Sequence, residues 1–361
     1  MKVVSVVGAR PQFVKAAPVC RALREHHDEV LVHSGQHYDY DMSEVFFEQL
    51  GIPRPDYNLA VGSGGHGRQT GEMLGMLEEL FSELGPDVVV VYGDTNTTLA
   101  GGLAAAKLHI PVAHVEAGLR SYNRSMPEEI NRVVVDHVSD LLLCPTRTAV
   151  ANLQAEGVVD GVELVGDVML DTARFFAEHV DTGATLSQHG LEAGGYYLAT
   201  VHRAATSDDA ERLSAVIRAF DRLAEPVLWA VHPRTRKNLA EMGLLDAVEG
   251  SDNIRAVSPL AYMDTVALLR SARGLLTDSG GMQKEAYFFG IPCVTLREET
   301  EWTETVELGW NRLVGTDEEA IVAAATSLER PAMRPDVYGD GHAAEAIVRA
   351  LDKRYGDRVA R

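Results

Sequence analysis

The chain has 361 residues, of which 46% are hydrophobic and 24% are charged, which is ordinary globular usage and enough length for two or three domains. Asp and Glu outnumber Lys and Arg by 53 to 33, and the net charge of -20 argues against the broad phosphate contact of a nucleic-acid-binding protein. The longest apolar runs fall far short of the ~18 residues of a membrane span. We therefore expect a cytoplasmic protein with no nucleic-acid partner and no membrane partner.

The three cysteines, Cys20, Cys144 and Cys293, lie far apart and include no C-x-x-C pair. This spacing supports neither a zinc knuckle nor a redox pair, so we expect buried free thiols and no metal site. The acidic balance fits two explanations, solubility alone or adaptation to a high-salt cytoplasm, and the sequence leaves both open.

Short β-branched runs alternate with helix-like segments through the first half of the chain. We expect strands at residues 3–7, 30–33, 88–92, 112–116 and 141–144. These runs are apolar on both faces, which is typical of parallel strands covered by helices on each side. Pro127 precedes Glu128 and Glu129, as in the first turn of a helix, so we expect a helix to begin there.

Residues 181–195 lose this periodicity and collect Gly, Thr, Ser and Gln, so we interpret them as a linker or a covering loop. The alternation then restarts, with strands expected at residues 196–201, 227–231, 254–257, 274–277 and 293–296. The pattern predicts two α/β domains, residues 1–170 and 171–340. A last helix within 341–361 either extends the second domain or packs back on the first.

Polar residues concentrate just after the expected strands, where open parallel sheets bind ligands. Ser279, Gly280 and Gly281 lie between a strand and a helix, and their bare amides suit a diphosphate. A plain helix cap with a glycine turn is an equal alternative. His202 and His232 each end a strand, and they are candidates for phosphate binding or proton transfer.

In the first domain, Arg10 and Lys15 follow the first strand and are candidate cations for a phosphate. A surface position is the commoner explanation for Arg10 alone, and a position on the helix exterior is the alternative for Lys15. If the strand ends of the two domains face each other, these groups line one cleft.

Three carboxylates, Asp94, Glu116 and Glu128, are candidates for acid–base chemistry. Glu116 ends an apolar strand, where a carboxylate is costly unless it is paired or solvated in a cleft, so a functional role is favoured. Asp94 has the alternative of a helix N-cap, and Glu128 has that of an i,i+4 pair with Arg132. For His114, a hydrogen-bonded core position is the favoured interpretation.

Several familiar sites do not occur in the sequence. The first strand is followed by one glycine, Gly8, instead of G-x-G-x-x-G, and there is no Walker A, H-E-x-x-H or G-x-S-x-G pattern. Residues 62–67 match G-x-G-x-x-G, but no strand–helix–strand unit frames them, so we expect a flexible loop. Nicotinamide oxidoreductases, zinc proteases and α/β-hydrolases are therefore disfavoured.

Six ordered motifs together resemble the non-hydrolysing UDP-N-acetylglucosamine 2-epimerase family, and they span nearly the whole chain. They are Gly8-Ala9-Arg10-Pro11 with Lys15, Tyr92-Gly93-Asp94-Thr95, His114-Val115-Glu116-Ala117-Gly118-Leu119-Arg120, Pro127-Glu128-Glu129-Ile130-Asn131-Arg132, His202-Arg203, and Thr277-Asp278-Ser279-Gly280-Gly281-Met282-Gln283-Lys284-Glu285. The resemblance implies two Rossmann-like domains of the GT-B type with parallel sheets facing across a cleft. It also implies a UDP-sugar substrate, a homodimer, and inversion at the sugar C2 without a cofactor.

The resemblance also implies roles for matching residues. The acid–base candidates are Asp94, Glu116 and Glu128, and the residues expected to hold the diphosphate are Arg10, His202, Ser279, Gly280 and Gly281. Glu285 is expected to bind the ribose hydroxyls, and Lys15 and Arg132 also belong to the site. The C2 proton has no neighbouring carbonyl, so the chemistry favours elimination of UDP to a glycal and re-addition.

Some residues depart from the family pattern. The family usually has a Glu-Asn pair within a few residues after His202-Arg203, where this chain has Ala204-Ala205-Thr206-Ser207. The segment from Gln36-His37 to Met42 is longer than in common bacterial members. Residues 8–13, 121–132 and 284–292 look closer to enzymes that act on UDP-2,3-diacetamido-2,3-dideoxyglucuronate, so that substrate stays an alternative. A GT-B glycosyltransferase and a non-catalytic UDP-sugar binder are the rivals from other functional classes.

Overall fold

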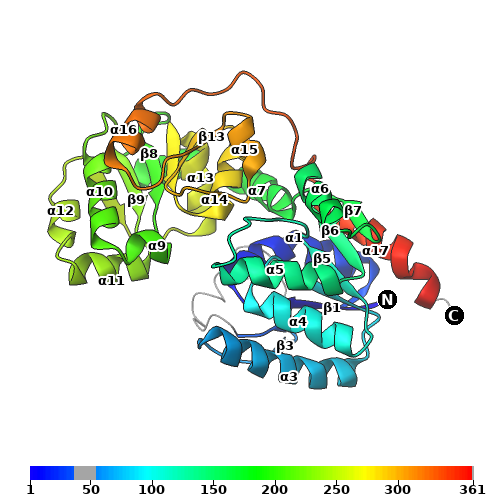
Figure 1. Cartoon of the computed structure of the whole chain (residues 1–361). Coiled ribbons are helices and arrows are strands. Elements are labelled where there is room, and N and C mark those ends of the chain that lie inside the picture. The colour runs from blue at the N-terminus through cyan, green and yellow to red at the C-terminus, as the bar shows by residue number, and fades with distance from the viewer. Residues whose placement is uncertain (36–53, 360–361) are drawn as a thin grey trace. The chain divides into compact units, whose positions relative to one another are not determined.

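The computed structural model describes residues 1–35 and 54–359, and it contains two compact units. Unit 1 comprises Met1–Arg174 and Asp336–Arg361, and unit 2 comprises Phe175–Pro335 (Figure 1). The sequence placed the domain boundaries at residues 170 and 340. Each unit contains one parallel sheet with helices on both faces, so the predicted α/β class with two Rossmann-like sheets is confirmed.

The sheet of unit 1 has seven parallel strands in the order β3-β2-β1-β4-β5-β6-β7. The strands are β1 (Lys2–Val7), β2 (Asp28–His33), β3 (Tyr57–Asn58), β4 (Val88–Tyr92), β5 (Val112–Val115), β6 (Leu141–Cys144) and β7 (Val162–Leu164). The chain builds outward from β1 to β3 and then returns to place β4 on the other side of β1. The neighbours β1 and β4 therefore form the topological switch point, where loops diverge and open α/β sheets bind ligands.

The helices of unit 1 form two layers around this sheet. They are α1 (Arg10–His26), α3 (His66–Leu84), α4 (Asn96–Lys107), α5 (Pro127–Val138), α6 (Arg147–Ala155), α17 (Ala343–Val359) and the first part of α7 (Val168–His179), which continues into unit 2 after Arg174. Met73, Leu77 and Phe81 of α3 share a buried cluster with Val4 and Val89 of the sheet, and α4 and α5 extend that layer. On the other face α17 packs against α1, so the C-terminal helix belongs to unit 1 (Figure 1).

Unit 2 repeats this plan with six parallel strands in the order β10-β9-β8-β11-β12-β13. The strands are β8 (Tyr197–Thr200), β9 (Val227–Ala230), β10 (Ile254–Val257), β11 (Gly274–Thr277), β12 (Cys293–Thr295) and β13 (Asn311–Leu313). The switch point of this sheet lies between β8 and β11. The loops after β8 and β11 therefore correspond to the loops after β1 and β4 in unit 1.

The helices of unit 2 cover both faces of its sheet. They are α8 (Thr182–Gln188), α9 (Ala204–Ser207), α10 (Ala210–Asp221), α11 (Pro233–Glu241), α12 (Leu245–Glu249), α13 (Tyr262–Ser271), α14 (Gly280–Phe289), α15 (Thr303–Glu307) and α16 (Glu318–Thr326). One face packs Leu213 and Phe220 of α10 against Trp229 of β9. The other packs Leu268 of α13 against Leu275 of β11.

Two interpretations of the sequence are wrong. Residues 181–195 contain α8, which begins because the Asp181 carboxylate accepts a hydrogen bond from Ala184 N, and Leu186 and Leu191 pack into the core. Residues 62–67 are not a loop throughout, since α3 begins at His66 after Gly65. The missed strands β3, β7 and β13 are edge strands of two or three residues, too short for a periodic pattern.

Several other predictions are confirmed, and two concern parts of the chain that the structure does not describe. The strands β4, β6, β10 and β11 have the predicted bounds, and all three cysteines are buried free thiols. Among the described residues, none of the helices combines the length and the apolar character that crossing a bilayer requires. The unusual segment from Gln36 to Met42 and the Arg10 side chain fall outside the described part of the structure.

Candidate active site

The first feature of unit 1 is a buried ion pair at the switch point. Lys15 of α1 donates to Glu116 Oε1 at 2.5 Å, and the two side chains are 10% and 6% exposed. Glu116 follows β5 with a φ of 71°, a left-handed conformation that side-chain-bearing residues adopt at a cost of about 1 kcal/mol or more. Gly93 makes room for the pair, since a Cβ there would lie 2.9 Å from Lys15 Nζ.

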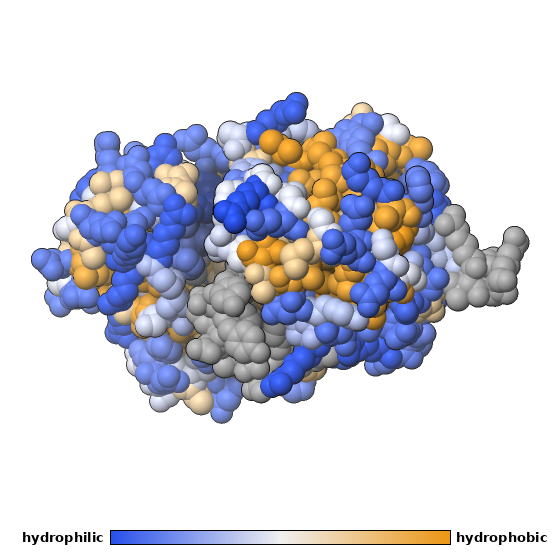
Figure 2. Space-filling view, turned by 90° about the horizontal axis from the view of Figure 1, so that it is seen from below, coloured by the Kyte–Doolittle hydropathy of each residue, from blue (hydrophilic) through white to orange (hydrophobic). Residues whose placement is uncertain are grey.

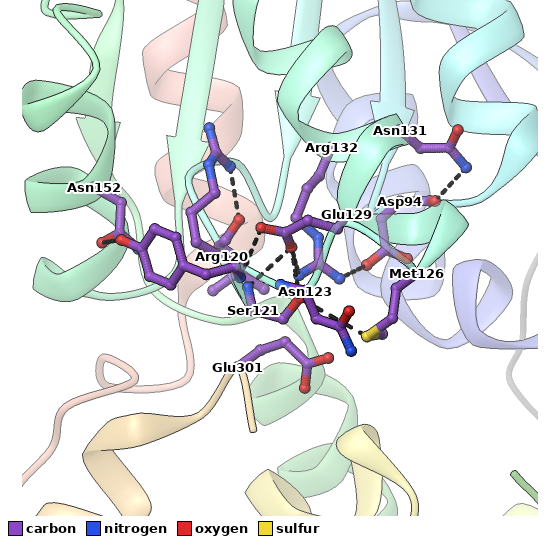
Figure 3. A network of polar contacts seen from close by, with 12 residues as sticks. Asp94, Arg120, Ser121, Asn123, Met126, Glu129, Asn131, Arg132, Asn152 and Glu301 are labelled. Atoms are coloured by element: carbon purple, nitrogen blue, oxygen red, sulfur yellow. Dashed lines mark hydrogen bonds and ion pairs between the residues drawn. The ribbon is translucent and has the colours of Figure 1, made fainter. Parts of the chain in front are cut away.

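The second feature is a chain of charged groups that ends at Asp94. Arg132 of α5 donates to Asp94 through one nitrogen and to Glu129 Oε2 through the other, the latter at 2.9 Å. Figure 3 shows these side chains converging from α5 and from the loop after β4. Asp94 does not cap α4, because Thr95 is the N-cap and its hydroxyl accepts from Thr98 N. The capping alternative for Asp94 is therefore excluded, and its carboxylate, about a quarter exposed, remains available for chemistry.

Glu129 organises this network, although it was not among the candidate residues predicted from the sequence. Its carboxylate accepts from Ser121 N at 2.9 Å, from Ser121 Oγ at 2.8 Å and from Tyr122 N at 2.9 Å, in addition to Arg132 (Figure 3). It is 3% exposed. The loop after β5 is thereby tied to α5, and Arg132 is held beside Asp94.

Glu128, the neighbouring residue, is exposed. The i,i+4 pair between Glu128 and Arg132 considered from the sequence does not form, since Arg132 pairs with Glu129 at i,i+3 instead. Both spacings allow a contact on a helix, and in the structure it is Glu129 that takes Arg132. The structure thus leaves the Glu128 carboxylate outside the buried network.

A second buried network lies behind the two loops. His114 Nδ1 lies 2.7 Å from Asp136 Oδ1, and Arg120 joins Asp136 to Glu156. Burial alone would raise the pKa of Asp136, but the hydrogen bond and charge of His114 and the charge of Arg120 bring that pKa below its ordinary value. The interpretation of His114 as a hydrogen-bonded core histidine is confirmed.

In unit 2, the Asp278 carboxylate binds backbone amides of the loop after β8. Its carboxylate is fully buried and accepts from His202 N at 2.9 Å and from Arg203 N at 2.8 Å. Asp278 Oδ1 also lies 3.3 Å from His202 Nδ1, and the His202 side chain is 39% exposed. Asp278 therefore joins the loops after β8 and β11 at the switch point.

The start of α14 fits an anion. Ser279 is the N-cap residue, but its side chain does not cap the helix, and Ser279 N donates to Thr277 Oγ1. The amides at the start of α14, those of Gly280 and Gly281 included, have no acceptor within the helix and lie at its positive end. A Cβ on Gly280 would lie 3.4 to 3.9 Å from Trp302, Glu301 and Arg203, so the space beside it is lined by polar groups.

The remaining candidate residues of unit 2 are His202, His232 and Glu285. The His202 and His232 rings are 5.9 Å apart, and His232 Nδ1 accepts from Arg234 N at 3.2 Å, which leaves its Nε2 to donate. Glu285 of α14 is 3% exposed and accepts a hydrogen bond of 2.7 Å from the Tyr262 hydroxyl. Tyr262 was missed from the sequence because nothing in its surroundings along the chain marks it as a partner of Glu285.

Residues 21–352 match the model of a family described as UDP-N-acetylglucosamine 2-epimerase. The chain is 48% identical to a UDP-N-acetylglucosamine 2-epimerase homolog of Methanococcus maripaludis, over 97% of this chain and 99% of that protein. It is 46% identical to the UDP-2,3-diacetamido-2,3-dideoxy-D-glucuronate 2-epimerase of Pseudomonas aeruginosa, over 98% of this chain and all of that protein.

Solved structures agree with these relatives. The Methanocaldococcus jannaschii UDP-GlcNAc 2-epimerase in complex with UDP-GlcNAc and UDP has a TM-score of 0.90 at 41% identity, covering 98% of this chain and 100% of that one. The calicheamicin glycosyltransferase CalG4 has a TM-score of 0.60 at 17% identity, over 99% of each chain, which shows a shared GT-B type fold alone.

Proposed function

This chain belongs to the UDP-N-acetylglucosamine 2-epimerase family and is a UDP-sugar 2-epimerase, an isomerase, and we propose that it interconverts UDP-N-acetylglucosamine and UDP-N-acetylmannosamine through elimination and re-addition of UDP. The observation that carries the proposal is the pair of carboxylates after β4 and β5. Asp94 and Glu116 each contact a buried cation, Arg132 and Lys15 respectively.

The reaction must invert a carbon whose proton is not acidic. In the proposed route a carboxylate removes the C2 proton, the C2–H electron pair forms the C1=C2 double bond, and the C1–O bond breaks so that UDP leaves with its electrons. UDP oxygen then adds back to C1, and a second acid delivers a proton to the opposite face of C2. This sequence balances without a redox cofactor.

Asp94, Glu116 and Glu128 are the proposed acid–base residues. A carboxylate is useful in proton transfer only if it is held within hydrogen-bond reach of the reacting atom. The ion pair with Lys15 fixes the Glu116 carboxylate, and Arg132 fixes that of Asp94. Glu128 is exposed and carries its role by resemblance alone.

We assign binding of the leaving diphosphate to Ser279, Gly280, Gly281, His202 and Arg10, with His232 nearby. Backbone amides at a helix start stabilise the charge that develops on a leaving phosphate, because they need no reorganisation during the reaction. The ribose hydroxyls are assigned to Glu285, whose second oxygen is oriented by the hydrogen bond from Tyr262 to the first.

The decisive test is isotope exchange in the presence of substrate. UDP-GlcNAc incubated with the protein in deuterated buffer should yield UDP-ManNAc with deuterium at C2, measured by proton NMR. A GT-B glycosyltransferase or a silent UDP-sugar binder would give neither label nor epimer. Absence of both with every UDP-sugar supplied would refute the epimerase proposal.

The second candidate substrate is UDP-2,3-diacetamido-2,3-dideoxyglucuronate, because the Pseudomonas aeruginosa enzyme named for it is 46% identical to this chain. The same exchange experiment with that sugar in a parallel arm compares kcat/KM directly. A higher value for the uronate would transfer the assignment to that substrate and leave the reaction class unchanged.

We also propose that the protein is a homodimer that forms through unit 1. The outward sides of α4 and α5 carry Leu103, Ile130, Val133 and Val134, which are half-buried or exposed. Hydrophobic residues gather on unit 1 in the right-hand part of Figure 2. Light scattering should give about twice 39.2 kDa, and Ile130→Glu should shift the mass toward the monomer. A monomeric wild-type protein would contradict the proposal.

The proposed compartment is the cytoplasm. Cys20, Cys144 and Cys293 are all free and buried, which suits a reducing environment.

A further inference from the structure

His114 and Asp136 form a fully buried pair that the proposed reaction does not use. His114 belongs to β5 and Asp136 to α5, and both residues are about 0–1% exposed. His114 Nδ1 lies 2.7 Å from Asp136 Oδ1, and His114 Nε2 lies 2.7 Å from the Gly93 carbonyl oxygen.

The partners of the ring determine where its protons are. A carbonyl oxygen only accepts, so His114 Nε2 carries a hydrogen and donates it to Gly93. The Asp136 carboxylate, which accepts from Gly118 N and Arg120 Nη1 at its other oxygen, is also an acceptor, so Nδ1 carries a hydrogen as well. The ring is then a cation, and it cannot act as a base for the substrate.

The same pair joins the two loops that carry the proposed acid–base residues. Gly93, which accepts from His114, directly precedes Asp94. Gly118 N, two residues after Glu116, donates to Asp136 Oδ2 at 3.1 Å. Gly93 and Gly118 both have positive φ values, 63° and 82°, so each contact falls at a tight turn of its loop.

Asp136 is held in turn by Arg120. Arg120 Nη1 donates to Asp136 Oδ2 at 2.7 Å, and its other nitrogens donate to the two oxygens of Glu156 at 2.7 and 2.6 Å. The four groups comprise two cations and two anions, which offsets the cost of burying each charge.

We propose that His114 and Asp136 are positioning residues that fix the Asp94 turn relative to the Glu116 turn during proton transfer at C2. The inference rests on the proposed function for the identity of the reaction. Its physical basis is that a rigid link between two turns sets the distance between their carboxylates, and an error of about 1 Å in such a distance costs about 100-fold in rate.

The kinetic test compares two substitutions with opposite expected outcomes. His114→Leu removes both hydrogen bonds, so kcat should fall about 10- to 100-fold while KM stays within about twofold. Asp136→Asn can keep every link, because its amide nitrogen can donate to a neutral His114 and its oxygen can still accept from Gly118 N and Arg120. We expect Asp136→Asn to keep kcat within about threefold of wild type, and His137→Leu, an exposed change on the same helix, to leave kcat unaffected.

Circular dichroism at assay temperature confirms that each variant is folded. A folded His114→Leu protein with wild-type kcat would overturn the inference, as would an Asp136→Asn protein as slow as His114→Leu. If His114→Leu does not fold, Asp136→Asn with retained kcat and Asp136→Ala with a fall in kcat at constant KM support the same conclusion, and equal rates of these two variants reject it.

Nuclear magnetic resonance of the nitrogen-15-labelled protein gives a readout that needs no turnover. Both ring N–H protons of His114 should appear in the wild-type spectrum at pH 7, and one should disappear in Asp136→Asn. A single ring N–H in the wild-type protein would overturn the inference. Because this spectrum can be recorded whether or not the protein epimerises a sugar, failure of the inference and failure of the proposed function are distinguishable.

Discussion

The two sheets present loops at their carboxyl ends in the same way, but different kinds of group hold those loops in place. In unit 1 the loops after β4 and β5 are held by charged side chains, with Lys15 on Glu116 and Arg132 between Asp94 and Glu129. In unit 2 the loops after β8 and β11 are held by Asp278, whose partners include the backbone amides of His202 and Arg203. Paired side chains suit proton transfer, which needs carboxylates at fixed positions, whereas backbone amides suit retention of a charged leaving group.

This difference has a thermodynamic counterpart. Buried side-chain charges are costly unless each is paired, so removing one partner in unit 1 leaves an uncompensated charge. The proposed diphosphate site of unit 2 consists of backbone amides, which a side-chain substitution does not remove. Substitutions near that site therefore act by moving the loops that carry the amides. Changes in the charged networks of unit 1 should therefore affect turnover, and changes at the Asp278 loops of unit 2 should affect affinity for UDP.

The largest expected effect is that of Glu116→Gln. Glutamine cannot exchange a proton and leaves Lys15 without its charge partner, so kcat should fall about 10²- to 10⁴-fold. Affinity for UDP, measured by titration calorimetry, should stay within about twofold because Glu116 is not among the residues assigned to the diphosphate. A variant that turns over at close to the wild-type rate would remove Glu116 from the mechanism.

Glu129→Gln tests whether the unit 1 network acts through geometry. Glutamine offers one acceptor oxygen where the carboxylate has two, so at least one bond to Ser121, Tyr122 or Arg132 is lost. Displacement of Arg132 should lower kcat about 10- to 100-fold with UDP affinity retained.

The matched control for Glu129→Gln is Glu72→Gln, which breaks an exposed ion pair with Arg68 on α3. This pair is exposed to solvent and contacts none of the groups around Asp94, so kcat of the variant should be unchanged. If both variants have the wild-type rate, the network does not position Arg132 for catalysis.

The corresponding change in unit 2 is Asp278→Ala. It leaves the amides of His202 and Arg203 without their buried acceptor, so the two loops should separate and the dissociation constant of UDP should rise about tenfold. Asp209→Ala removes a similar carboxylate from two amides at the start of α10 and serves as the control, with UDP affinity expected to be unchanged. Equal losses of affinity in the two variants would mean that unit 2 is generally destabilised.

The strands and the polar residues at their carboxyl ends could be predicted from the sequence, but the strand order and the networks could not. Runs such as Val88–Tyr92 are apolar on both faces, so they mark strands, and the polar residues after them mark the ligand edge. Glu129 and Tyr262 act through partners that folding brings together, and neighbouring residues in the chain do not reveal those partners. The error at α8 has a related cause, because that helix depends on one cap and on Leu186 packing in the core.

The smallest expected effect is a dependence of the stability of unit 1 on pH. Asp171 of α7 accepts from the amides of Ala343 and Ala344 at the start of α17, and burial, reinforced by the charges of Asp167 and Glu345, raises its pKa to about 6 despite those two hydrogen bonds. A raised carboxyl pKa contributes stability that is fully present below the unfolded pKa of 3.8 and is lost as pH rises through about 6. Unit 1 should therefore lose stability between these values.

Asp171→Asn removes this titration and keeps one acceptor oxygen. Because the lost hydrogen bond partly offsets the removed charge, we expect a gain of about 1 kcal/mol at pH 8 and no gain at pH 5. Thermal melts at the two pH values measure the difference, with Asp160→Asn, at an exposed pair with Arg354, as the control. An equal shift of the melting temperature at both pH values would show that Asp171 does not titrate in this range, and the pH dependence of unit 1 would then have to come from its other buried carboxylates.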